Sequence, residues 1–228
     1  GKVGSTTVER ALTDADFFTL HVHTLSRSFT PLSGNWPPAH KHQITSDFIR
    51  NNLLDKSPLR IVTGVRDPIA RNISAFFQNL RSFGFSPDRL TEADVPTLIS
   101  VFLEHFHHSG PAEWFDRELR NCLGVDVFTH AFAGDYATLE DRHSVLILKT
   151  EADDAVKTTA LQRFVGRGVA LRRENVGAQK GYAGAYRAFV DQIRLDDAYL
   201  DTQYNTKYCR HFYTEAEIAA FRRKWRPR

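Results

Sequence analysis

Seven residues at the start of the chain combine the groups that bind a phosphate or a sulfate. One cation, two glycines and three hydroxyls stand together in Gly1-Lys2-Val3-Gly4-Ser5-Thr6-Thr7, and a helix-like stretch follows. Glycine lets a backbone approach a ligand closely, and the N–H groups at a helix start attract anions. The segment therefore predicts an anion-binding turn, although an ordinary glycine-containing helix start is the alternative. It is not a Walker A loop, whose lysine follows the second glycine.

A second segment places an arginine at the end of a predicted strand. Residues 59–65 are apolar and β-branched, and Arg66-Asp67-Pro68 follows at once. Asp67 suits a helix N-cap and Pro68 the first helical turn. Arg66 is then expected at the carboxyl end of a strand, where open α/β sheets bind ligands, as a bidentate phosphate clamp. Ser74 lies two turns into the helix, where it can face the same pocket. A surface ion pair and a solvated serine are the alternative.

In this order, the two segments resemble the donor site of sulfotransferases that use 3′-phosphoadenosine 5′-phosphosulfate (PAPS). GKVGSTT is similar to their 5′-phosphosulfate loop, and VRDPIARNISAFF is similar to their 3′-phosphate-binding segment. The resemblance implies that Lys2 contacts the oxygen that bridges phosphate and sulfate. It also implies that the 5′-phosphate is held by Gly4, Ser5, Thr6 and Thr7, and the 3′-phosphate by Arg66 and Ser74.

Later pieces resemble the carbohydrate sulfotransferases and the related bacterial capsular polysaccharide synthesis family. These pieces are Glu113-Trp114-Phe115-Asp116, the predicted strand 145–148 with Lys149-Thr150-Glu151, and Asn205-Thr206-Lys207-Tyr208 with Arg210-His211-Phe212-Tyr213. This resemblance implies that the acceptor is a hydroxyl of a carbohydrate or glycan.

Histidines supply the candidates for a catalytic base. In-line sulfuryl transfer needs a base for the acceptor hydroxyl, and histidine suits neutral pH. Two His-x-His pairs occur, His21 with His23 and His40 with His42. The second pair resembles a segment of uronyl 2-O-sulfotransferases, which makes His42 the first choice for the base and His40 a substrate contact. His23 is the second choice, with His21 a substrate contact. A hydrogen-bonded structural histidine is the alternative for each.

A late basic loop and one tryptophan complete the candidate site. Arg173 and Lys180 lie in a glycine-containing segment that resembles the loop closing over the nucleotide in such enzymes, and a solvated turn is the alternative. Trp114 is expected either to stack on a sugar or to pack in the core. The pattern of His105, His107 and His108 has no carboxylate cluster beside it, so we expect no metal site.

Composition fits one sulfotransferase domain over residues 1–228. The chain is 42% hydrophobic with a formal net charge of +3, which suits an anionic donor. The sequence contains no nucleic-acid-binding motif, no secretory signal and no apolar run of membrane-spanning length, so neither nucleic acid nor stable membrane insertion is expected. Cys122 and Cys209 have neither a disulfide framework nor zinc-ligand spacing.

Apolar periodicity and caps predict strands that alternate with helices. Strands are expected over residues 17–22, 59–65 and 144–148, with helices over 5–13, 46–54, 68–81, 91–107, 111–123, 152–164, 181–195 and from 214 on. The pattern predicts an α/β fold, a three-layer, mostly parallel sheet flanked by helices, and the resemblance adds a P-loop-like sulfotransferase core. Because the sequence opens at the anion-binding turn, we expect a first strand to precede residue 1.

The residues and the resemblance together predict a PAPS-dependent sulfotransferase that releases adenosine 3′,5′-bisphosphate and uses no metal. A small-molecule kinase using ATP and Mg²⁺ and a non-catalytic nucleotide- or glycan-binding module are the alternatives. The sequon Asn72-Ile73-Ser74 lies in the predicted nucleotide-binding helix, where a glycan would block Ser74. This position favours a bacterial cytoplasmic enzyme over a Golgi lumenal domain.

Overall fold

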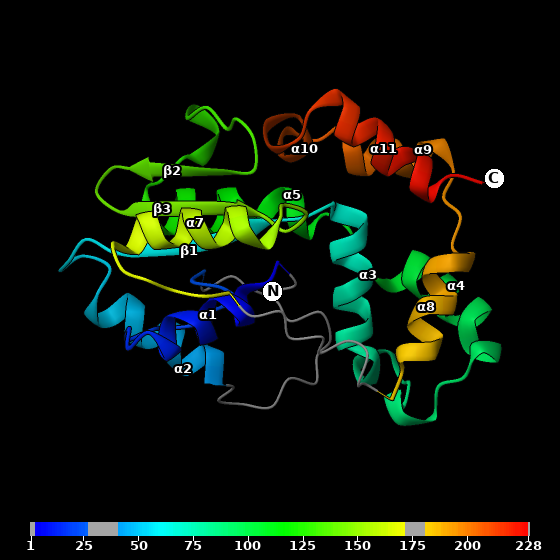
Figure 1. The fold of residues 1–228 in the computed structure, drawn as a ribbon. Helices are drawn as coiled ribbons and strands as arrows, with labels where there is room; N and C mark the ends of the chain where they lie inside the picture. The colour runs from blue at the N-terminus through cyan, green and yellow to red at the C-terminus, as the bar shows by residue number, and fades with distance from the viewer. Residues whose placement is uncertain (1–2, 27–40, 172–180, 228) are drawn as a thin grey trace. The chain divides into compact units, whose positions relative to one another are not determined.

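A computed structural model describes residues 3–26, 41–171 and 181–227, and its contacts gather in two compact units (Figure 1). Among the described residues, the first unit holds residues 3–26, 41–66 and 113–171. The second holds residues 67–112 and 181–227. Both units draw on separate stretches of the chain, so the description of residues 1–228 as a single domain stays a prediction.

The first unit contains a small sheet with helices. Its elements are α1 (Ser5–Asp14), α2 (Lys41–Asn52), β1 (Arg60–Val65), the end of α5 (Gly110–Phe115), the π-helical turn η4 (Asp116–Arg120), α6 (Asn121–Leu123), the 3₁₀ turn η5 (Val127–Thr129), β2 (Tyr136–Glu140), β3 (Ser144–Lys149) and α7 (Asp154–Val165). The strands predicted over 59–65 and 144–148 are thereby confirmed as β1 and β3.

The sheet of the described residues has three strands in the order β1-β3-β2. β1 runs parallel to β3, with Gly64 opposite Leu148, while β2 and β3 form an antiparallel hairpin. The fold is therefore mixed α/β, with one parallel and one antiparallel pairing where a mostly parallel sheet was predicted. The strand predicted over residues 17–22 is wrong, since this segment has no strand partner and Phe18 is largely exposed.

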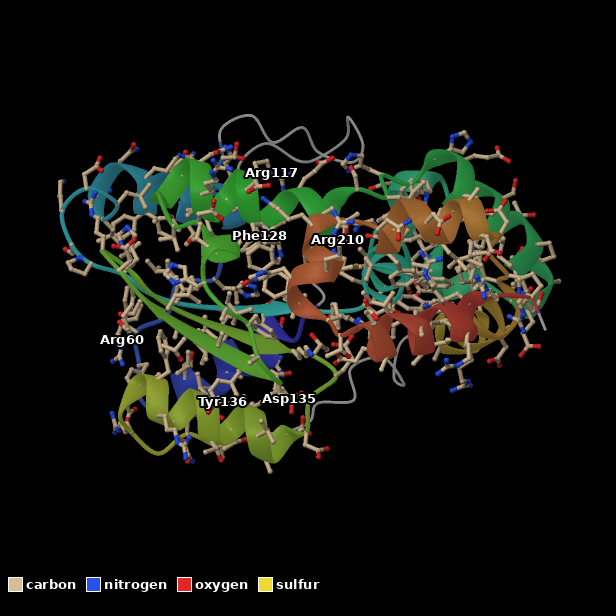
Figure 2. The ribbon with its side chains drawn as sticks, turned by 90° about the horizontal axis from the view of Figure 1, so that it is seen from above. Arg60, Arg117, Phe128, Asp135, Tyr136 and Arg210 are labelled. Atoms are coloured by element: carbon tan, nitrogen blue, oxygen red, sulfur yellow. The ribbon has the colours of Figure 1, made fainter. Side chains whose placement is uncertain are left out.

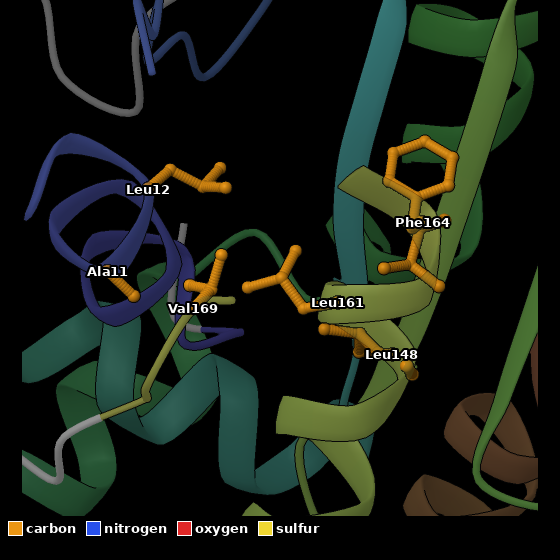
Figure 3. Packing of buried hydrophobic residues seen from close by; sticks show 8 residues of the cluster. Ala11, Leu12, Leu148, Leu161, Phe164 and Val169 are labelled. Atoms are coloured by element: carbon orange, nitrogen blue, oxygen red, sulfur yellow. The ribbon is translucent and has the colours of Figure 1, made fainter. Parts of the chain in front are cut away.

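Strand β3 is the centre of the first unit's core. Leu146 and Leu148 point to one face of the sheet, where they pack with side chains of α1 and α7 (Figure 3). The cluster on this face consists of Ala11, Leu12, Leu146, Leu148, Ala160, Leu161, Phe164 and Val169. Val145 and Ile147 point to the other face and are also buried. A strand buried on both faces explains the continuous apolar run in its sequence.

Residues 110–123 form one helical segment with a local change of pitch. The helix predicted over 111–123 is confirmed as α5, η4 and α6 in succession. It ends at Gly124, whose φ of 73° is the left-handed conformation that favours glycine at a helix end. The π-helical turn lies at Asp116–Arg120, and turns of this kind are frequent at functional sites.

The second unit is helical throughout its described residues. Its elements are α3 (Pro68–Gln78), the 3₁₀ turns η1 (Leu80–Phe83), η2 (Pro87–Arg89) and η3 (Glu92–Asp94), α4 (Val95–His105), the start of α5, α8 (Ala183–Gln192), α9 (Asp197–Tyr204), α10 (Lys207–Phe212) and α11 (Glu215–Trp225). None of the helices in the described part of the chain is long and apolar enough to cross a membrane.

Aromatic rings fill the core of this unit. The ring of Phe76 on α3 lies 5.4 Å from that of Phe102 on α4 and 6.1 Å from that of Phe189 on α8, between centroids. Phe77 meets Tyr186 at 5.0 Å and Phe189 at 5.1 Å. Edge-to-face pairs of this kind add to the stabilisation that burial provides. Tyr186 and Phe189 therefore mark the face of α8 that packs into this core.

Three helix starts are capped by nearby side chains. Asp67 caps α3, because its carboxylate accepts a hydrogen bond from the backbone N–H of Ile69 at 3.1 Å. Thr91 with Asp94 and Thr214 with Glu217 form capping boxes ahead of α4 and α11.

Candidate functional site

The predicted anion-binding turn lies at the carboxyl end of β1. Gly4 has a φ of 78° and directly precedes α1, and the N–H of Val8 donates to the Gly4 carbonyl at 3.2 Å. A Cβ atom on Gly64 would lie only 2.8 Å from the carbonyl oxygen of Val3. Val3 therefore passes so close to the penultimate residue of β1 that only glycine fits there.

The first turn of α1 offers unpaired backbone donors at this position. In a helix, the first N–H groups have no intrahelical partner, and the helix dipole gives them partial positive charge. No described side chain caps α1, and its first turn contains no acidic residue. Ser5, Thr6 and Thr7 form this turn and add hydroxyl groups. The arrangement suits a phosphate, and the predicted Lys2 lies outside the described residues.

Arg66 lies at the same end of β1 as this turn. It directly follows Val65, is half-buried and belongs to the first unit together with Gly4 and Gly64. The structure thus brings the two predicted phosphate-binding segments of that unit to one strand end. Ser74 is half-buried on the second turn of α3, in the second unit, and its role as a 3′-phosphate ligand stays a prediction.

A carboxylate–imidazole pair lies one helical turn further along α1. Nδ1 of His21 is 2.6 Å from Oε2 of Glu9, and the His21 side chain is only 14% exposed. Glu9 is four residues after Ser5, so both lie on the same face of α1. The His23 ring meets the His21 ring edge-on at 5.1 Å. The carboxylate holds the His21 ring in one orientation through Nδ1, and an oriented imidazole is a feature of catalytic bases.

Trp114 holds the backbone next to this pair. Its indole N–H donates to the carbonyl of His23 at 3.1 Å, and its ring meets Phe115 edge-on at 5.1 Å. The contact gives Trp114 a structural role within the first unit, and its contact with a sugar stays a prediction.

Four predicted site residues cannot be placed with their side chains. His42 lies in the first turn of α2, but its side chain lies outside the described part of the chain, as do the whole of His40, Arg173 and Lys180.

Glu118 anchors the backbone of residues 24–26, a role that no local sequence pattern indicates. It is 1% exposed and accepts hydrogen bonds from the backbone N–H groups of Leu25 at 2.5 Å and Ser26 at 3.0 Å. The Thr24 hydroxyl and the Arg117 guanidinium complete its partners at 2.8 and 2.7 Å. Arg117 is labelled in Figure 2 on the helical segment that carries Glu118. The buried carboxylate thereby fixes the chain just beyond His23.

In the second unit, Asp67 joins three helices. Besides capping α3, its carboxylate accepts a hydrogen bond from the Tyr204 hydroxyl at 2.8 Å and from the Trp225 indole N–H at 2.9 Å. All three side chains are at most 2% exposed. Burial raises the pKa of Asp67 above its ordinary value, and the bonds from Trp225 and Tyr204 oppose that shift.

His108 is also built into the second unit. Its Nδ1 lies 2.7 Å from the Tyr199 hydroxyl, and its Nε2 lies 3.0 Å from the carbonyl oxygen of Phe102. Since a carbonyl only accepts, Nε2 carries the proton and Nδ1 accepts from the tyrosine. Burial lowers the pKa of His108, which favours the neutral ring. Among the described residues, no group of three metal-ligating side chains comes together.

A family model described as "putative capsular polysaccharide synthesis protein" matches residues 94–214, which is more than half of the chain. The chain belongs to this family. The match covers β2, β3 and most helices of the second unit, but neither the turn at Gly4 nor Arg66 and Ser74. No curated protein and no solved structure matches the chain significantly. Family membership thus supports a role in polysaccharide synthesis, independently of the proposed donor site.

Proposed function

We propose that this capsular polysaccharide synthesis family member is a PAPS-dependent sulfotransferase acting on a glycan hydroxyl. The observation that carries the proposal is the position of the Gly4 turn and Arg66 at one end of β1. Two phosphate-binding segments that resemble those of sulfotransferases are thereby juxtaposed. A three-layer, P-loop-like core is part of the proposal.

In the proposed reaction, the acceptor oxygen attacks sulfur in line with the bond to the bridging oxygen. The new S–O bond forms as the bond to the phosphate breaks, and adenosine 3′,5′-bisphosphate leaves. The α1 N-terminus and Lys2 stabilise the charge that develops on the leaving phosphate. The acceptor proton passes to a histidine, and this chemistry needs no metal.

The Glu9–His21 contact favours His21 as the base. The described partner of His21 is the carboxylate of Glu9, which lies on the helix whose N-terminus is proposed to bind the phosphosulfate. His42, the first choice from the sequence, and His23, the second choice, are the alternatives for the base, and His40 stays a predicted substrate contact. Donor contacts by Arg173 and Lys180 are also part of the proposal.

The burial of Asn72, the acceptor residue of the sequon, supports a cytoplasmic bacterial location. Asn72 is fully buried, and its side-chain amide donates to the carbonyl of His108 at 2.8 Å. A glycan on this buried nitrogen could not be accommodated in the folded unit. We therefore propose that the chain folds in a compartment that lacks the glycosylation machinery of a secretory pathway.

Titration calorimetry with adenosine 3′,5′-bisphosphate tests the proposed donor. We expect saturable 1:1 binding of the bisphosphate and no binding of ATP with Mg²⁺. Replacing Arg66 by Gln is expected to weaken the bisphosphate about tenfold or more, because a charge-assisted phosphate contact is lost. Arg60→Gln is the matched control, since Arg60 is exposed at the opposite end of β1. Tight binding of ATP with Mg²⁺ alone would point to the kinase alternative and contradict the proposal.

Substitution of Glu9 by Gln tests the proposed base. Loss of the carboxylate removes the acceptor that orients the His21 ring, so we expect about a tenfold lower kcat with little change in KM. Glu104→Gln is the control, because Glu104 contacts His105 at 3.8 Å with both side chains 64% exposed. An unchanged kcat in Glu9→Gln would exclude His21 and return the role to His42 or His23.

A further inference from the structure

The second unit contains a cavity that the proposed donor chemistry does not use. It has a volume of about 280 Å³ and lies where the start of α3 meets the segments around residues 108–112 and 202–208. The residues that line it are Pro68, His108, Ser109, Pro111, Ala112, Thr202, Gln203, Thr206 and Tyr208. All nine belong to the second unit. The volume is just below the roughly 300–1,000 Å³ of pockets for drug-sized ligands, which suits one sugar ring better than a nucleotide.

The lining carries hydroxyl and amide groups but no lysine, arginine, aspartate or glutamate. His108 is its one imidazole, and the bonds to Tyr199 and Phe102 hold that ring in a neutral tautomer. A phosphate or sulfate would find no full positive charge there, and burying an unpaired anion is costly. The lining chemistry therefore favours an uncharged ligand rich in hydroxyl groups.

Gln203 is the polar side chain of the lining that is best placed to form hydrogen bonds with such a ligand. It is 8% exposed, and its amide nitrogen lies 3.3 Å from the Thr202 hydroxyl. The Thr202 hydroxyl itself donates to the carbonyl of Tyr199 at 2.7 Å. Within the described part of the chain, the amide oxygen of Gln203 accepts no hydrogen bond. Pro68, Pro111 and Ala112 add apolar surface for the C–H faces of a sugar.

The cavity lies in the part of the chain that the family model covers. Eight of its nine lining residues fall within residues 94–214, Pro68 being the exception. We propose that this cavity binds one uncharged sugar residue of the glycan acceptor, an inference that rests on the proposed function for the identity of the glycan as substrate.

Saturation-transfer NMR on the full chain tests this binding with defined probes. Methyl glycosides of glucose, galactose and N-acetylglucosamine serve as neutral ligands, and glucuronate and glucose 6-phosphate as charged ones. We expect saturation transfer to at least one neutral glycoside and none to the charged sugars. Preference for the charged sugars, or transfer to none of the probes, would overturn the proposal.

Two variants localise the binding. Gln203→Leu is expected to weaken the neutral glycoside about five- to tenfold, the effect of one or two lost hydrogen bonds, with Gln192→Leu on exposed α8 surface as control. Ala112→Leu fills the cavity and is expected to abolish binding, with Ala198→Leu on the exposed face of α9 as control. Unweakened binding in both cavity variants would overturn the proposal.

Adenosine 3′,5′-bisphosphate binding is measured on the same samples. Glycoside binding by a chain that fails to bind the bisphosphate would support the cavity and contradict the proposed sulfotransferase. Bisphosphate binding without any glycoside binding would overturn the cavity proposal alone.

Discussion

Replacing Lys2 by alanine is expected to lower the rate of sulfuryl transfer by about two to three orders of magnitude. The ammonium group is proposed to neutralise the charge that develops on the leaving phosphate, and loss of one preorganised donor of this kind typically has such an effect. The backbone donors of the α1 N-terminus remain, so bisphosphate binding is expected to weaken less than the rate falls. The measurement is release of adenosine 3′,5′-bisphosphate from PAPS with a panel of neutral oligosaccharides as acceptors.

Lys56→Ala is the matched control for this experiment. Lys56 is exposed after α2, so its loss makes the same change of net charge at a surface position. Circular dichroism of both variants shows whether the helices are retained. A Lys2→Ala protein that keeps the wild-type rate would contradict the assignment of the anion-binding turn.

Replacing Asp67 by alanine is expected to destabilise the protein by about 3–5 kcal/mol. The change removes the N-cap of α3 and leaves the Tyr204 hydroxyl and the Trp225 indole N–H buried without their acceptor. Losing a cap costs about 1 kcal/mol and each buried unpaired donor about 1–3 kcal/mol. Chemical denaturation followed by circular dichroism gives the free energy of unfolding. Asp88→Ala is the control, because Asp88 is 78% exposed in the same unit.

The pH dependence of stability provides a second test of the same residue. Burial raises the pKa of Asp67 above its ordinary value of 3.8, so the folded protein holds this proton more tightly than the unfolded chain does. Its contribution is therefore full below pH 3.8 and decreases as the pH rises through the folded-state pKa. We expect the stability of wild type relative to Asp67→Asn to fall over this range. A relative stability that rises with pH would contradict the expectation.

Local chemistry accounts for what could be predicted from the sequence. The cap at Asp67 and the capping box at Thr214 depend on residues within one turn, and both are found. Strands β1 and β3 are apolar along their length, which makes burial evident before any partner is known. At the candidate site, the glycine, lysine and hydroxyl run and the strand-end arginine could be recognised because each is a continuous segment.

The missed features depend on contacts between distant residues. Strand β2 has an exposed edge and mixed polarity, so only its pairing with β3 defines it. Residues 17–22 have strand-like composition but no neighbouring strand. Three contacts at the candidate site also had no local sequence pattern to indicate them. They are the approach of Val3 to Gly64, the Glu9–His21 pair and the burial of Glu118. These tertiary contacts shape the candidate site beyond its motifs.

The pairing of β1 with β3 has a consequence for how the chain is synthesised. β1 leaves the ribosome first, and its parallel partner is translated only after residues 66–143 have emerged. The hairpin of β2 and β3 closes locally, whereas the β1 contact must close a long loop, which slows folding. During that interval the apolar strand RIVTGV is a nascent segment without its sheet neighbour. Recombinant yield is therefore expected to improve with slow translation at low temperature or with extra chaperone.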